Sequence, residues 1–178
     1  MKSKLAALLL VFGCTRQPAQ RPTDSAARIA VRPRPRFEAF PADSIYHGPV
    51  APVDLRSSPG AREFRTVLRE GADGPPNFAG GYRVVEWGCG SPCHTFAIVT
   101  TATGQVYMPD IAAMSGIAFR PNSRLLVVEP PGDVIELCQE GWMRPICEDV
   151  YSYYYVWDGH RLALLDSIVV DSSATQHR

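Results

Sequence analysis

The cysteine at position 14 constrains the fold of this chain most, because it predicts the compartment in which the chain folds. Lys2 and Lys4 precede an apolar run, Leu5–Phe12, and Gly13 stands directly before Cys14. This order is typical of a lipoprotein export signal. As a helix, the run covers only ~12 Å of a bilayer core of ~30 Å, so it cannot span a membrane. We expect residues 1–13 to be a cleaved signal peptide and lipid on Cys14 to anchor the mature chain to a membrane.

Export predicts disulfide bonds among the other four cysteines, which are Cys89, Cys93, Cys138 and Cys147. An even number outside the cytoplasm favours two disulfides. We favour Cys89 with Cys93 and Cys138 with Cys147, because each bond closes a short local loop, and the chain-entropy model gives such loops ~2 to 3 kcal/mol apiece. A crossed pairing would close a loop of about fifty residues and stabilise by ~4 kcal/mol, so it stays open.

Length and charge narrow the class of protein. About 165 residues follow the predicted signal, which is enough for one domain with its own core. Sixteen arginines stand against eighteen acidic residues, and this balance gives no electrostatic footprint for nucleic acid.

Thr15 stands where lipoproteins retained at the inner membrane of two-membrane bacteria have an aspartate. We therefore expect attachment to the outer membrane, facing the periplasm.

The chain divides into a tether, a domain and a tail. Residues 14–36 are rich in proline and arginine and nearly free of aromatic residues, so they cannot bury a core. We expect them to form a lipidated, extended tether. Residues 37–170 form the predicted single domain, and residues 171–178 a disordered tail.

Residue patterning predicts an α+β domain that is mainly antiparallel sheet. Helical spacing of apolar residues predicts one short helix near the domain's N-terminus, over Ala61–Arg69. Short β-favouring runs between turn residues predict six to eight strands joined as meanders. The candidate strands are Tyr82–Trp87, Thr95–Thr100, Gln105–Met108, Ile117–Phe119, Leu125–Val128, Val134–Leu137, Tyr151–Trp157 and Leu162–Val170.

Two hairpins and an aromatic strand stand out. Asp158-Gly159 predicts a two-residue turn with positive φ at both positions, and Thr103-Gly104 a slightly longer loop. Alternation puts four aromatic residues on one face of the first strand of the Asp158-Gly159 hairpin, namely Tyr151, Tyr153, Tyr155 and Trp157. Such a row is either part of the core or an exposed surface for sugars or flat ligands.

A dense motif carries the only family resemblance. It runs from Asn-Phe-Ala-Gly-Gly-Tyr at residues 77–82 through a strand into Trp-Gly-Cys-Gly-Ser-Pro-Cys-His at residues 87–94. With residues 123–128 and 154–159, it resembles a family of uncharacterised exported bacterial proteins over roughly Phe37–Val170. That resemblance brings no established activity. The family often has histidine before the tyrosine, where this chain has Gly81, which weakens an enzymatic interpretation.

The cysteine loop supports several kinds of site. Glycines beside Cys89 and three intervening residues before Cys93 favour a structural clip at a strand end. The alternatives are a redox-active pair activated by His94, and a zinc site from Cys89, Cys93 and His94 with Cys138 or Cys147. A binding loop here would use four residues, Trp87, Gly88, Gly90 and His94.

Recognised catalytic motifs are absent from the sequence. There is no Gly-x-Ser-x-Gly elbow, His-Glu-x-x-His pair, phosphate-binding loop or dinucleotide fingerprint. We expect no cofactor and no metal. We expect an acidic stretch over residues 133–149 to be a solvated loop, with attraction of a cation or a basic partner as the alternative. The sequence favours a non-enzymatic module that binds an envelope protein or wall polymer. An envelope enzyme or thiol–disulfide protein centred on Cys89, Cys93 and His94 is the alternative.

Overall fold

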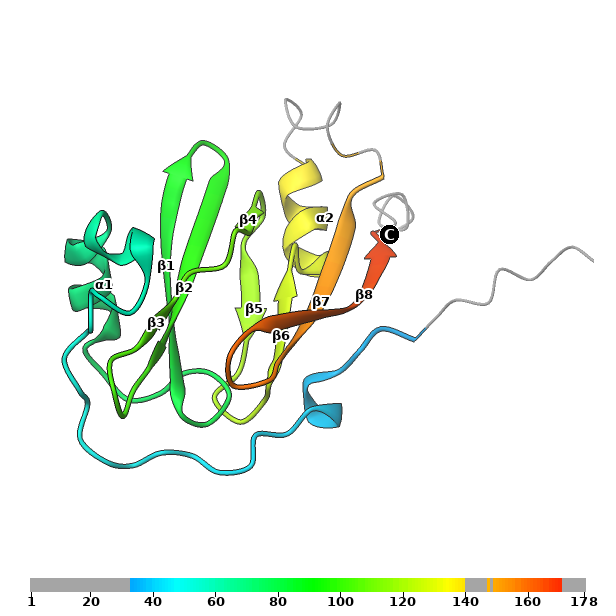
Figure 1. Cartoon of the computed structure of the whole chain (residues 1–178). Helices are drawn as coiled ribbons and strands as arrows, with labels where there is room; N and C mark the ends of the chain where they lie inside the picture. The colour runs from blue at the N-terminus through cyan, green and yellow to red at the C-terminus, as the bar shows by residue number, and fades with distance from the viewer. Residues whose placement is uncertain (1–32, 140–146, 148, 171–178) are drawn as a thin grey trace, which may run out of the picture. The chain divides into compact units, whose positions relative to one another are not determined.

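The computed structural model describes residues 33–139, 147 and 149–170 (Figure 1). The predicted signal, Cys14, most of the predicted tether and the predicted tail therefore lie outside the described residues. Within them are eight strands, namely β1 Tyr82–Gly90, β2 Cys93–Thr100, β3 Val106–Tyr107, β4 Ala112–Ala113, β5 Ile117–Phe119, β6 Leu125–Val128, β7 Tyr151–Trp157 and β8 Leu162–Val169. The helices are α1 Arg65–Ala72 and α2 Pro131–Gln139, with 3₁₀ turns η1 Phe37–Ala39 and η2 Pro59–Arg62.

The first sheet is built on the antiparallel β1–β2 hairpin. Tyr82 pairs with Thr100 at one end, Gly88 pairs with His94 near the other, and both β3 and β4 pair with β2. The residues from Phe96 to Val99 are all buried. A strand that is buried on both faces reads as a continuous apolar run, and here α1 covers one face while the second sheet covers the other.

The second sheet has the order β5-β6-β7-β8 and is antiparallel throughout. It faces the first sheet through a core that includes Phe96 and Ile98 on one side and Leu126, Val128 and Trp157 on the other. Its opposite face packs on the segment around η1 (Figure 1). The predicted α+β class with mainly antiparallel strands is confirmed, but the strands form two four-stranded sheets.

Two helices replace the single one predicted. The predicted helix over 61–69 is shifted: η2 ends at Arg62 and α1 runs to Ala72, burying Leu68 and Ala72 against the first sheet. It is not N-terminal within the described chain, because residues 33–64 precede it.

The predicted strand Val134–Leu137 is wrong, because these residues belong to α2. A short apolar run is compatible with either structure. Pro131 at the first helical position and Asp133 in the first turn are helix-start signals that outweigh it. The helix buries Val134 and Cys138 in a small core near the ends of β7 and β8.

The predicted Thr103-Gly104 loop joins β2 to β3, with Gly104 at φ 73°. The predicted two-residue Asp158-Gly159 turn is wrong, because β7 ends at Trp157 and β8 begins at Leu162. Only Gly159 has positive φ there. The Asp158 carboxylate accepts hydrogen bonds from the backbone N–H groups of His160 and Arg161, both at 2.8 Å, and so favours a four-residue turn.

Candidate functional site

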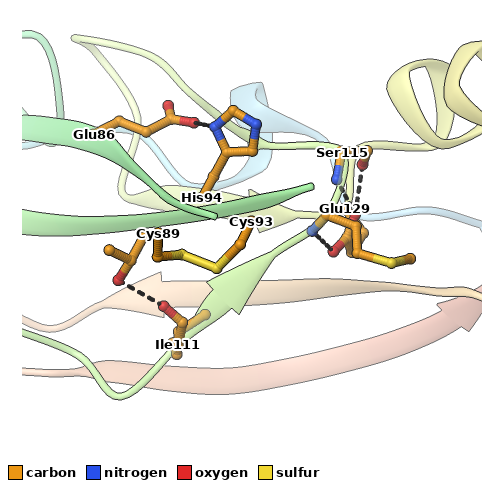
Figure 2. Close-up of polar contacts among 9 residues, drawn as sticks. Glu86, Cys89, Cys93, His94, Ile111, Ser115 and Glu129 are labelled. Atoms are coloured by element: carbon orange, nitrogen blue, oxygen red, sulfur yellow. Dashed lines mark hydrogen bonds and ion pairs between the residues drawn. A yellow bond between two sulfur atoms is a disulfide. The ribbon is translucent and has the colours of Figure 1, made fainter. Parts of the chain in front are cut away.

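The end of the β1–β2 hairpin holds the cysteine loop predicted from the sequence. Gly88 pairs with His94 and Gly90 with Cys93, which leaves Cys89 as an extra residue in β1. Cys89 and Cys93 form a disulfide with a Cα–Cα distance of 5.0 Å (Figure 2). The disulfide therefore closes the tip of the hairpin.

The second disulfide joins Cys138, in the last turn of α2, to Cys147 with a Cα–Cα distance of 5.9 Å. Both cysteines are buried. The favoured local pairing is thus confirmed, and the crossed pairings are wrong. The zinc alternative loses its thiolate ligands, because the four sulfurs are paired in two disulfides.

Glu86 and His94 meet beside this tip. Their register puts both side chains on the face of the hairpin that faces the second sheet. His94 Nδ1 lies 3.2 Å from Glu86 Oε1 (Figure 2). In the neutral form of the imidazole, this contact puts the proton on Nδ1 and leaves Nε2 as an acceptor.

Partial burial raises the pKa of the Glu86 carboxyl, whose side chain remains 33% exposed. The nearby charge of Asp133 raises the pKa further, whereas His94 opposes the shift through its charge and hydrogen bond. Asp133 belongs to α2, so the carboxyl responds to a helix as well as to its own hairpin. Perturbed carboxyls of this kind gather at functional sites, although structural ion pairs produce them too.

A pocket of about 530 Å³ opens at this place. Its walls come from three parts of the chain: the hairpin tip with Pro92 and His94, the segment after β4 with Met114, and α2 with Asp133 and Glu136. We call it the hairpin pocket. It combines one imidazole with two carboxylates in its lining, and Glu86 lies behind the imidazole.

Glu129 braces one wall of the hairpin pocket. Its carboxylate accepts hydrogen bonds from the backbone N–H groups of Met114 and Ser115 and from the Ser115 hydroxyl (Figure 2). The Ser152 hydroxyl donates to the Glu129 carbonyl at 2.6 Å. Glu129 is buried and has φ 57°, a conformation rare outside glycine. In the sequence, Glu129 is marked only as an acidic residue that directly follows an apolar strand.

Trp87 is not brought together with His94. It points to the opposite face of the first sheet, where its ring centroid lies 4.8 Å from that of Phe64. Gly88 and Gly90 do line the hairpin pocket. Of the four predicted binding-loop residues, the structure therefore gathers three at the pocket and puts Trp87 under α1.

The aromatic row on β7 is divided between core and surface. Trp157 is only 3% exposed and packs near Tyr82, with ring centroids 5.1 Å apart. Tyr155 is partly buried against the same core. Tyr151 and Tyr153, which are 39% and 36% exposed, lie beyond it with ring centroids 6.3 Å apart. The row thus becomes less buried away from Trp157.

The Asn-Phe-Ala-Gly-Gly-Tyr motif has structural contacts. The Asn77 side chain exchanges two hydrogen bonds with the backbone of Val84, and Phe78 is fully buried. The motif also borders a second pocket of about 560 Å³, lined by Gly81 and Trp157 among others. The Trp157 indole nitrogen is buried without a hydrogen-bond partner among the described residues.

Among the described residues, no group of three or more histidine, cysteine or acidic side chains is arranged to hold a metal ion. Across the same residues, no helix is long and apolar enough to cross a membrane. Compared with known proteins, the chain matches no family model, no curated protein and no solved structure.

Proposed function

We propose that this chain is a lipid-anchored protein of the bacterial cell envelope whose β domain binds another envelope component without catalysing a reaction. The hairpin pocket is the observation that carries the proposal. A disulfide fixes the hairpin tip, and the Glu129 hydrogen bonds fix the segment after β4. Small binding sites are usually preformed in this way.

The charges around the hairpin pocket favour a partner that presents a cationic group. Asp133 and Glu136 line the pocket, and His94 is its only basic lining residue among those described. Because the imidazole already contacts Glu86, it does not neutralise the two α2 carboxylates. An amine or guanidinium forms charge-assisted hydrogen bonds with such carboxylates. The partner that fits best is therefore an envelope protein with an exposed lysine or arginine.

The contacts of the nearby hydroxyls and thiols support binding rather than catalysis. The Ser115 hydroxyl donates to Glu129, and the sulfurs of Cys89 and Cys93 are bonded to each other. No serine hydroxyl or free thiol donates to His94 in the described part of the chain. A nucleophile activated by a base needs that contact, at least loosely.

Affinity capture tests this function. The mature chain would be immobilised and exposed to an envelope extract, in parallel with His94→Ala and Asp133→Asn/Glu136→Gln variants. His160→Ala is the matched control, because His160 is exposed in the turn between β7 and β8. We expect one partner to be retained by the wild type and the control and lost by both pocket variants. Retention by all four proteins, or by none, would contradict the proposal. A wall fragment as the partner would contradict the assignment to a protein.

A thiol–disulfide protein is the second candidate function. The observation that favours it is that Cys89 is exposed, while Cys93 and His94 line the same pocket. A protonated imidazole beside the pair would stabilise a thiolate on reduction.

The two disulfides provide an internal comparison for this second candidate. Treatment of the folded chain with a mild reductant, followed by thiol alkylation and peptide mass spectrometry, gives a rate for each bond. Rapid reduction of Cys89–Cys93 under conditions that spare the buried Cys138–Cys147 bond would support redox activity. Protection of both bonds would exclude it and leave a structural clip.

A further inference from the structure

Four arginines surround one pocket on the other face of the first sheet. The pocket has a volume of about 500 Å³ and is lined by Arg56, Arg62, Arg65 and Arg69. We call it the arginine pocket. It lies beside α1, which packs on the face of the sheet turned away from the hairpin pocket, and the two pockets share no lining residue.

Three of the four arginines belong to η2 and α1. Arg65 and Arg69 are four residues apart in α1 and so share one side of the helix, and Arg62 ends η2 shortly before it. In the same helix Leu68 is fully buried and packs α1 onto the first sheet. Arg56 comes from the preceding turn, where its backbone N–H donates to Asp54 Oδ1 at 3.0 Å.

One carboxylate against four guanidinium groups leaves the arginine pocket positively charged among the described residues. Among the described residues, the arginines in ion pairs are Arg120 and Arg161. None of these ion pairs involves a guanidinium of the arginine pocket. Asp54 is the only carboxylate in the lining, and its Oδ1 atom is already an acceptor. Cations at such spacing repel one another, and α1 has no acidic residue in its first turn.

We propose that the arginine pocket binds a phosphate ester. Guanidinium groups form paired hydrogen bonds with phosphate oxygens, and several of them match a doubly charged group better than a single carboxylate. Val53 and Leu55 also line the pocket, which gives the carbon part of an ester an apolar contact. The phosphate belongs to a lipid headgroup or to a soluble ester, because both present the same chemistry.

Calorimetric titration tests the chemistry of this site. The mature chain from Thr15 onward, made without lipid, would be titrated with glycerol 3-phosphate and with acetate. We expect glycerol 3-phosphate to bind at least tenfold more tightly than acetate. An Arg65→Gln/Arg69→Gln variant should lose at least tenfold in affinity for the phosphate ester. Arg120→Gln/Arg161→Gln removes the same charge elsewhere and should change the affinity less than twofold.

Each outcome of the titration is decisive once folding is checked by circular dichroism. All four substituted arginines are exposed, so both variants should keep the core. Absence of saturable binding to every phosphate probe, or equal losses in the two double variants, would overturn the proposal.

Vesicles identify the source of the phosphate. Sedimentation with phosphatidylcholine vesicles, with and without phosphatidate, would be compared for the same three proteins. Binding that needs phosphatidate, Arg65 and Arg69 identifies a lipid headgroup. Binding to glycerol 3-phosphate alone identifies a soluble ester. Failure of both arms overturns the phosphate site and leaves the hairpin pocket untouched, because loss of the envelope partner is measured with different variants.

Discussion

At the scale of single residues, Glu86 links the hairpin pocket to the stability of the domain. Burial raises its pKa, so the folded domain holds the proton more tightly than the unfolded chain does. The resulting contribution to stability is complete below the ordinary glutamate pKa and is lost as pH rises through the raised value. His94 limits this loss because it favours the charged carboxylate.

We predict that Glu86→Gln becomes more stable relative to the wild type as pH rises from about 4 towards neutrality. Urea unfolding at several pH values measures the difference. Glu38→Gln is the control with the opposite sign, because a backbone hydrogen bond and Arg120 lower the pKa of Glu38. Its loss of stability should be present near neutral pH and vanish as pH falls through the lowered pKa. The same slope in both variants would contradict this account.

Gly80 and Gly81 are adjacent but differ in their surroundings. Gly80 has φ 77°, and a Cβ there would lie 1.8 Å from the Ser44 carbonyl oxygen. A Cβ at Gly81 would meet nothing within 4 Å. We predict that Gly80→Ala lowers the free energy of unfolding by at least ~1 to 2 kcal/mol, whereas Gly81→Ala changes it by less than ~1 kcal/mol. Equal effects of the two substitutions in thermal or urea unfolding would contradict the close approach of Gly80 to the Ser44 carbonyl.

At the scale of elements, we expect the disulfide between α2 and Cys147 to contribute more to the free energy of unfolding than the Cys89–Cys93 disulfide. Cys138 and Cys147 are buried with Val134 and Val170, whereas Cys89 is exposed. We predict that Cys138→Ala/Cys147→Ala costs ~2 to 3 kcal/mol from loop entropy, plus a cavity term. Cys89→Ala/Cys93→Ala should cost less, about 2 kcal/mol, because its loop is shorter and little core is lost. The reverse order in urea unfolding would contradict this.

Local patterns predicted the elements that depend on neighbouring residues. β1, β2, β7 and β8 follow from alternation and turn residues, and the short disulfide loops follow from spacing. α2 was missed because its short apolar run has no clear period. The division into two sheets was not readable, since it depends on which distant strands pair.

For the same reason, the candidate site could be predicted from the sequence only in part. Once Cys89 bonds to Cys93, the hairpin register puts Glu86 diagonally across from His94, so this pair was implicit in the spacing. The pocket wall from α2 and the Glu129 brace join residues far apart in the chain. The arginine stripe at helical spacing was visible in the sequence, whereas its pocket required the position of Arg56.

At the scale of the whole molecule, we expect lipid on Cys14 to decide where the domain works. We predict that mass spectrometry of the mature N-terminal peptide finds Cys14 as its first residue, carrying diacylglycerol and an acyl chain. Cys14→Ser should carry no lipid and should not be cleaved before position 14. Cys89→Ser/Cys93→Ser should keep the lipid. Lipid that persists on the Cys14→Ser chain would contradict the predicted anchor.

Site-specific photo-crosslinking in the living cell tests the central claim, that the hairpin pocket is where this protein meets its partner. The crosslinking residue would replace exposed Ser91 at the pocket rim, with the same replacement at exposed His160 as the control. We predict one protein adduct from position 91 that disappears with His94→Ala and is absent from position 160. No adduct from position 91, or the same adducts from both positions, would contradict it.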